Sequence, residues 1–173
     1  MERTDIFKLA DKPVTIVGPD IQIGQKTPEF TVRAQDWSIL DALKSTEGKV
    51  RVICAVPSLD TSTCDAEAKR FNEEAASLDK DIAILTVSTD LPYALKNWCA
   101  ATGVDKVTVL SDAFDVNFGE KYGVLIKDRR VFRRAVFVVD RNGNVVYSDY
   151  MPVLGDQPKY EEVLIAAKKA LAS

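Results

Sequence analysis

Two near-continuous apolar runs constrain the fold of this chain more than any other feature of its sequence. The runs are Val50–Val56 and Ile82–Ser88, and both are rich in β-branched residues. A strand that is apolar throughout, rather than alternating with polar residues, is typical of a sheet covered on both faces. Between the runs, apolar residues recur at helical spacing from Asp65 to about Leu78. This strand–helix–strand order predicts central strands of a sheet with helices packed against it.

The remaining segments predict further parts of the same sheet and the helices that cover it. Strands are expected at Thr27–Arg33 (at an edge), Val107–Leu110, Arg134–Asp140 and Val145–Tyr147, with an N-terminal hairpin over Phe7–Val17. Helices are expected at Trp37–Leu43 (a short turn), from Asp90 as a cap to Gly103, at Phe114–Tyr122 and from Tyr160 to Leu171, and Asn142-Gly143 indicates a type I′ turn. The order predicts an α/β, thioredoxin-like fold: a mixed central sheet with helices on both faces and an N-terminal β-hairpin. At 173 residues, one domain over 1–173 is expected.

Histidine is absent from the chain, and this excludes several classes of function. Cys-His proteases, Ser-His-Asp hydrolases and most zinc sites need that residue. The three cysteines, Cys54, Cys64 and Cys99, form no C-x-x-C pair, which argues against a structural metal site. No cofactor is expected. The net charge is −3 and no basic cluster interleaves with aromatic residues, which argues against a nucleic-acid partner. No signal peptide or membrane-spanning run is visible, and a cytoplasmic location is expected.

Cys64 stands where a thiol is most readily activated. It follows the Val50–Val56 strand and lies in the first turn of the next helix, whose start is indicated by Ser62 and Asp65. Unpaired backbone N–H groups and the positive end of the helix dipole favour a thiolate there. Since the thiolate is the nucleophilic form, this position makes Cys64 the leading candidate for chemistry.

The residues around Cys64 resemble the active-site signature of peroxiredoxins. The signature is Pro57-x-x-x-Thr61-x-x-Cys64, within Pro-Ser-Leu-Asp-Thr-Ser-Thr-Cys. Further matching stretches are Phe71-Asn72, Asp90-Leu91-Pro92-Tyr93, Trp98-Cys99-Ala100-Ala101-x-Gly103 and Arg134-Ala135-Val136-Phe137-Val138-Val139-Asp140. Together they are similar to the thiol peroxidase subfamily, the atypical two-cysteine peroxiredoxins, along nearly the whole chain.

That resemblance implies a role for each matching residue. Cys64 would be the peroxidatic cysteine that attacks a hydroperoxide, an alkyl hydroperoxide or hydrogen peroxide, and becomes a sulfenic acid. Cys99 would resolve it as a disulfide within one chain, which thioredoxin would then reduce. Thr61 would hydrogen-bond the thiolate and the peroxide, Pro57 would shield the thiolate from water, and Arg134 would supply fixed positive charge. The resemblance also implies a homodimer.

Simpler interpretations exist for each of these residues. Cys64 could be an inert core cysteine, Cys99 a buried neighbour of Trp98, and Cys54 is most simply a core residue without chemistry. Thr61 could only cap a helix, Pro57 could only end a strand, and Arg134 could be a solvated charge at a strand end.

Two other functions fit the same fold. One is a thiol–disulfide oxidoreductase, disfavoured because no resolving thiol lies two residues from Cys64. The other is a non-catalytic binding module or a redox sensor.

The disulfide that the resemblance implies has a structural consequence. Because Cys64 and Cys99 are expected on separate helices, a disulfide between them is expected to require local unwinding.

Overall fold

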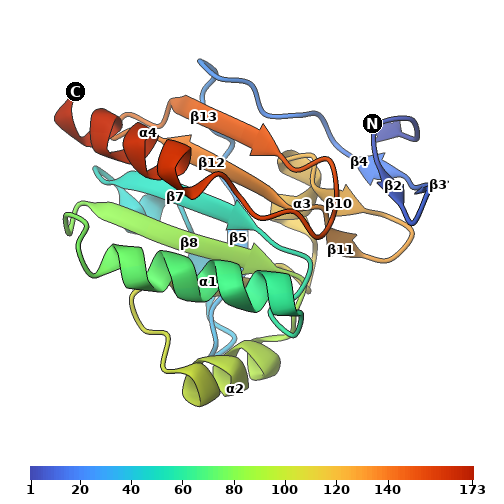
Figure 1. The fold of residues 1–173 in the computed structure, drawn as a ribbon, viewed down its shortest axis with the longest axis horizontal. Coiled ribbons are helices and arrows are strands. Elements are labelled where there is room, and N and C mark those ends of the chain that lie inside the picture. The colour runs from blue at the N-terminus through green and yellow to red at the C-terminus, as the bar shows by residue number, and fades with distance from the viewer.

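The computed structural model describes residues 1–173, and its centre is a seven-stranded mixed sheet (Figure 1). In spatial order the strands are β13 (Val145–Tyr150), β12 (Ala135–Val139), β7 (Val50–Ala55), β8 (Ile82–Ser88), β9 (Thr108–Ser111), β5 (Thr31–Arg33) and β6 (Ile39–Asp41). The three central strands β7, β8 and β9 are parallel, and those on either side are antiparallel to their neighbours. The predicted mixed α/β fold is confirmed.

Helices cover both faces of this sheet, as the apolar central strands require. The helices are α1 (Ser62–Ala75), α2 (Pro92–Thr102), α3 (Asn117–Lys121) and α4 (Tyr160–Ala172), with a 3₁₀ turn η1 (Lys44–Thr46). Val52 and Cys54 of β7 pack with residues of α1 and α4, which cross one face side by side (Figure 1). Ile53 and Ala55 point the other way and pack with α3. Period-two alternation of one strand thus builds two cores. None of the helices is long and apolar enough to cross a membrane.

The N-terminal segment forms the expected hairpin, but the hairpin is shorter than predicted. Strands β2 (Lys8–Leu9) and β3 (Lys12–Pro13) pair around Ala10 and Asp11, which both have positive φ. The following Ile16–Val17 (β4) joins a separate four-stranded sheet instead, between β1 (Glu2–Arg3) and β10 (Leu125–Ile126), with β11 (Val131–Phe132) outermost. Apolar residues of the segment pack on Ile126, which fixes it to the body of the protein.

Two predictions for the other edge of the sheet were wrong. The segment Trp37–Leu43 contains strand β6 rather than a helical turn, because Ile39–Asp41 pairs antiparallel with Thr31–Arg33. That pairing makes β6 the edge strand and places β5 inside the sheet, against β9. Trp37 has a φ of 71° at the turn between them.

The prediction of a type I′ turn at Asn142-Gly143, between β12 and β13, was also wrong. A type I′ turn needs positive φ at both central residues, and here only Gly143 has it.

The ends of α1 and α2 differ from expectation in ways that matter for the site. Helix α1 begins at Ser62, so Thr61 is its N-cap residue, and no side chain caps it. Helix α2 begins at Pro92 with Leu91 as N-cap, so Asp90 does not cap it. Gly103 ends α2 in the left-handed conformation, with a φ of 74°, as glycine commonly does.

Candidate active site

Cys64 lies in the first turn of α1 and is fully buried. The loop from Pro57 carries the chain from the end of β7 to this helix, and Cys64 has no exposed surface. Its neighbours in a small apolar cluster come from the loop, α1, α2 and β9: Val56, Leu59, Ala68, Leu95 and Val109. The thiol is therefore held at a helix N-terminus, away from bulk water.

Arg134 provides a guanidinium directly at this sulfur. Its Nη2 donates to Cys64 Sγ at 3.2 Å, and Nη1 donates to Glu67 Oε2 at 2.5 Å. The Leu154 carbonyl accepts from Nη2 at 3.2 Å and from Nε at 3.4 Å. Burial disfavours the charged form, but Glu67 and Cys64 outweigh it, and the pKa of Arg134 is raised. A buried cation therefore contacts the Cys64 sulfur directly, at 3.2 Å.

Glu67 belongs to the site and was missed by the sequence reasoning. It is three residues after Cys64, so the two side chains share one face of α1. The side chain is 1% exposed, and its Oε1 has no hydrogen-bond partner. Burial raises the pKa of Glu67 to about 7, although Arg134 acts in the opposite direction. One feature of the sequence could have identified Glu67: it is an acidic residue at a position that the helical spacing assigns to the apolar face of α1.

Pro57 and Thr61 flank the cysteine on the loop side. Pro57 is buried at the end of the strand. Thr61 is exposed, and its hydroxyl donates to the Ser58 carbonyl at 2.8 Å rather than to Cys64 Sγ. Its own carbonyl accepts from the Asp65 N–H at 2.9 Å as the first bond of the helix. Arg134 and Cys64 are thus brought together, whereas the Thr61 hydroxyl is engaged within the loop.

Asp90 has a role that differs from the predicted helix cap. One carboxylate oxygen accepts from Ser58 Oγ at 2.6 Å, and the other accepts from the Leu59 N–H at 2.9 Å and from Ser88 Oγ at 2.8 Å. The residue lies between β8 and α2, so these bonds fasten the loop before Cys64 to the start of the neighbouring helix. They hold the loop in the shape that buries the thiol.

Cys99 lies on α2, close to the same apolar cluster as Cys64. It is half-buried, packs against that cluster together with Trp98, and accepts from Gln35 Nε2 at 3.4 Å. Burial raises the pKa of Cys99, and the Gln35 hydrogen bond partly offsets this.

All three cysteines are free thiols. Cys54 is buried in β7, and burial, with Glu67 adding to the effect, raises its pKa well above the ordinary value. No three or more Cys, Asp or Glu side chains are grouped to hold a metal ion.

Comparison with known proteins gives consistent matches. The model of the AhpC/TSA family matches residues 23–148. A thiol peroxidase of Halalkalibacterium halodurans is 47% identical over 159 residues, 92% of this chain and 95% of the relative. A thiol peroxidase of Bacillus subtilis is 47% identical over 156 residues, 90% and 92% of the two chains. The crystal structure of a peroxiredoxin-like protein from Aquifex aeolicus superposes with a TM-score of 0.84 at 38% identity, covering 95% and 96% of the two chains.

The fold is thioredoxin-like, and the relatives place the chain among cysteine-dependent peroxidases. With the family match and the relatives above, the chain belongs to the AhpC/TSA family. The relatives confirm the resemblance drawn from the sequence and the prediction of a peroxiredoxin-type, thiol-dependent peroxidase.

Replacing Glu67 by glutamine tests the buried ion cluster through its pH dependence. The folded protein binds the Glu67 proton more tightly than the unfolded chain, because its pKa is about 7 instead of 4.5. The free energy of unfolding of the wild type is therefore expected to fall relative to Glu67→Gln as pH rises from about 4.5 through about 7. Urea denaturation of both reduced proteins across this range measures the difference. Glu73→Gln, an exposed change on the same helix, is the control, and a pH-independent difference for Glu67→Gln would contradict the assignment.

Removing the Asp90 carboxylate is expected to destabilise the reduced protein. Asp90→Ala loses three hydrogen bonds to the loop and strand, and leaves the Ser58 hydroxyl proton and the Leu59 N–H without an acceptor. Bonds to a charged acceptor of this kind predict a loss of about 2–3 kcal/mol in the free energy of unfolding. Chemical denaturation measures it, with Asp60→Ala on the exposed part of the same loop as control. Equal stability of the two variants would contradict this role of Asp90 in holding the loop.

Proposed function

We propose that Cys64 is the nucleophile of a hydroperoxide reductase cycle completed by Cys99. The observation that carries this proposal is the 3.2 Å contact of Arg134 Nη2 with a fully buried Cys64 Sγ at a helix start. Peroxide cleavage needs a thiolate and a donor near the oxygen that leaves with negative charge. A guanidinium beside the sulfur can serve both, because it presents several N–H groups in one plane.

The cycle has three balanced steps. The Cys64 thiolate attacks the terminal oxygen of a hydroperoxide ROOH, the O–O bond breaks, and the alkoxide takes a proton to leave as ROH. Cys64 is oxidised to a sulfenic acid. The Cys99 thiol then displaces hydroxide from that sulfur, releasing water and forming the Cys64–Cys99 disulfide. A dithiol reductant, proposed to be thioredoxin, reduces the disulfide by exchange and becomes a disulfide itself.

The other residues of the proposed site support the first step. Buried Pro57 is proposed to exclude water from the thiol, and Thr61 to bind a peroxide oxygen once its hydroxyl rotates away from the Ser58 carbonyl. Glu67 and the Leu154 carbonyl hold the Arg134 guanidinium in place. The proposal further includes one domain over residues 1–173 and a cytoplasmic location.

Cysteine variants test the division of labour between the three thiols. Cys64→Ser is expected to abolish peroxide consumption. Cys99→Ser is expected to retain one turnover per chain, to form no intramolecular disulfide, and to lose turnover with thioredoxin. Cys54→Ala is the control, since that thiol is buried in the sheet, and is expected to keep full turnover. The measurement is peroxide consumption by the reduced protein with and without catalytic thioredoxin. Full turnover by Cys64→Ser would overturn the proposal.

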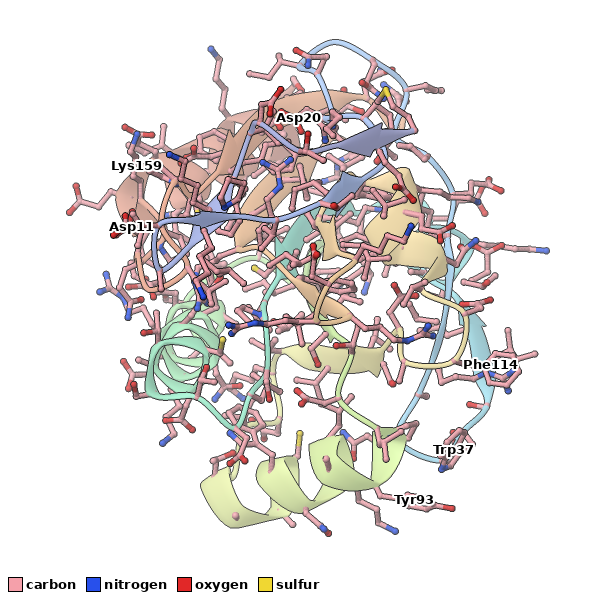
Figure 2. The ribbon with its side chains drawn as sticks, turned by 90° about the vertical axis from the view of Figure 1, so that its right-hand side faces the viewer. Asp11, Asp20, Trp37, Tyr93, Phe114 and Lys159 are labelled. Atoms are coloured by element: carbon pink, nitrogen blue, oxygen red, sulfur yellow. The ribbon has the colours of Figure 1, made fainter.

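The proposal includes a homodimer formed through an exposed aromatic surface. Trp37, Tyr93 and Phe114 lie along one side of the molecule (Figure 2). Tyr93 is 65% exposed, Phe114 66% and the neighbouring Ile39 66%, and the rings of Trp37 and Tyr93 are 5.3 Å apart. Adjacent exposed side chains of this kind are typical of a protein–protein contact.

A charge placed in this aromatic surface is expected to shift the protein towards monomer. Tyr93→Glu would place a carboxylate in an apolar contact, which we expect to weaken self-association at least about tenfold. Sedimentation velocity over a range of concentrations measures this. Lys96→Glu, an exposed change on the same helix, is the control. A wild type that is monomeric at all concentrations would contradict the dimer.

A further inference from the structure

Three hydrogen-bonded ties connect helix α1 and its leading loop to helix α2 and its flanking segments. The first is the set of bonds from Asp90 to the loop before Cys64. The second joins Trp98 Nε1 of α2 to Asp65 Oδ1 of α1 at 3.0 Å. The third joins Asn72 Oδ1 of α1 to the backbone N–H groups of residues 105 and 106, at 3.2 and 2.7 Å.

Only the second tie lies directly beside both redox cysteines. Asp65 is the residue after Cys64, and Trp98 is the residue before Cys99. A disulfide requires the two Cα atoms to come within about 7 Å with suitable geometry. If either helix unwinds at its cysteine to reach that geometry, the adjacent Asp65 or Trp98 moves with it. The Asp65–Trp98 bond is therefore lost in either event, whereas Asn72, two helical turns further along α1, can stay in place.

We propose that the Asp65–Trp98 hydrogen bond is a latch that holds the two cysteines apart and sets the rate of disulfide formation. Asp65 and Trp98 are positioning residues, since they act through the helices that carry Cys64 and Cys99. This inference rests on the proposed function of the two cysteines. While the latch is closed, the Cys64 sulfenic acid stays in the folded site.

A closed latch exposes the sulfenic acid to a competing reaction. A second hydroperoxide can transfer its terminal oxygen to that sulfur, giving a sulfinic acid and ROH. When the latch opens, Cys99 reacts instead, giving the disulfide and water. The latch therefore determines how the sulfenic acid divides between resolution and further oxidation.

The surroundings of the two side chains allow the latch to be removed without removing the packing. Trp98 is half-buried and packs against two apolar clusters, each of which includes residues of α1. Trp98→Phe keeps an aromatic ring there but loses the N–H donor. Asp65 also pairs with Lys69 Nζ at 2.8 Å, one turn along α1. Lys69→Ala removes this ion pair and leaves the bond to Trp98, which makes it the matched control.

The test follows the fate of Cys64 after rapid mixing of the reduced full-length protein with tert-butyl hydroperoxide. Acid quenching, thiol alkylation and mass spectrometry count sulfenic acid, disulfide and sulfinic acid over time. Trp98→Phe and Asp65→Ala are each expected to form the disulfide roughly three- to tenfold faster than the wild type, the factor that one net hydrogen bond corresponds to. Sulfinic acid per turnover is expected to fall in the same proportion. Loss of the Cys64 thiol to the first peroxide is expected at the wild-type rate, and Lys69→Ala is expected to match the wild type throughout.

The double variant Asp65→Ala with Trp98→Phe separates a latch from general destabilisation of the helices. Both single changes remove the same bond, so the double variant is expected to form the disulfide no faster than either single one. Additive acceleration, or single variants no faster than the wild type, would overturn the latch alone. A wild type that reacts with peroxide but forms no Cys64–Cys99 disulfide would overturn the proposed function, and the latch with it.

Discussion

The buried guanidinium of Arg134 is the interaction on which the rest of the site depends. A charge that is 1% exposed is costly unless it is paired and hydrogen-bonded. Its partners are Cys64 and Glu67 on α1 and the Leu154 carbonyl on the loop before α4. The pairing of β12 with β7 sets Ala135 opposite Ala55, which brings Arg134 to the end of β7 where the chain turns towards α1. The sheet register therefore places a cation where the helix begins.

In the proposed cycle, the same arrangement explains why the loop and the first turn of α1 could open around Cys64 after its oxidation. In the proposed cycle Cys64 changes from an anion to an uncharged sulfenic acid. That change removes the charge that Arg134 and the N-terminal end of α1 stabilise. The folded loop and first turn then lose part of their stabilisation, while the tethers from Asp90 and Asp65 remain. Opening of the site would thus depend on two structural carboxylates, neither of which contacts the sulfur.

Elements fixed by local apolar pattern were predicted well from the sequence, and contacts made across long separations were not. The strand at Ile82–Ser88 and the helix after Cys64 follow from near-continuous or helical apolar spacing. Strand β6 was missed because its backbone pairing with β5, rather than its own pattern, decides its conformation. Asp90 sits just before a helix and so resembles a cap, yet its carboxylate binds a loop 31 residues earlier.

The candidate site was predicted to a similar extent. Cys64 could be identified by its position at a helix start, and Arg134 only by family resemblance, because Arg133 beside it has the same chemistry. Arg133 points elsewhere, to the Gly123 carbonyl and over the Tyr150 ring.

Glu67 differs from Arg134, its ion-pair partner, in how its charge responds to pH. A guanidinium keeps its charge at any cellular pH, whereas a carboxyl with a pKa of about 7 does not. The candidate site thus pairs one group of permanent charge, Arg134, with one carboxyl whose pKa is raised by burial. Arg134 Nη1 contacts Glu67 and Nη2 contacts the Cys64 sulfur, so a change of charge on Glu67 acts one guanidinium away from that sulfur.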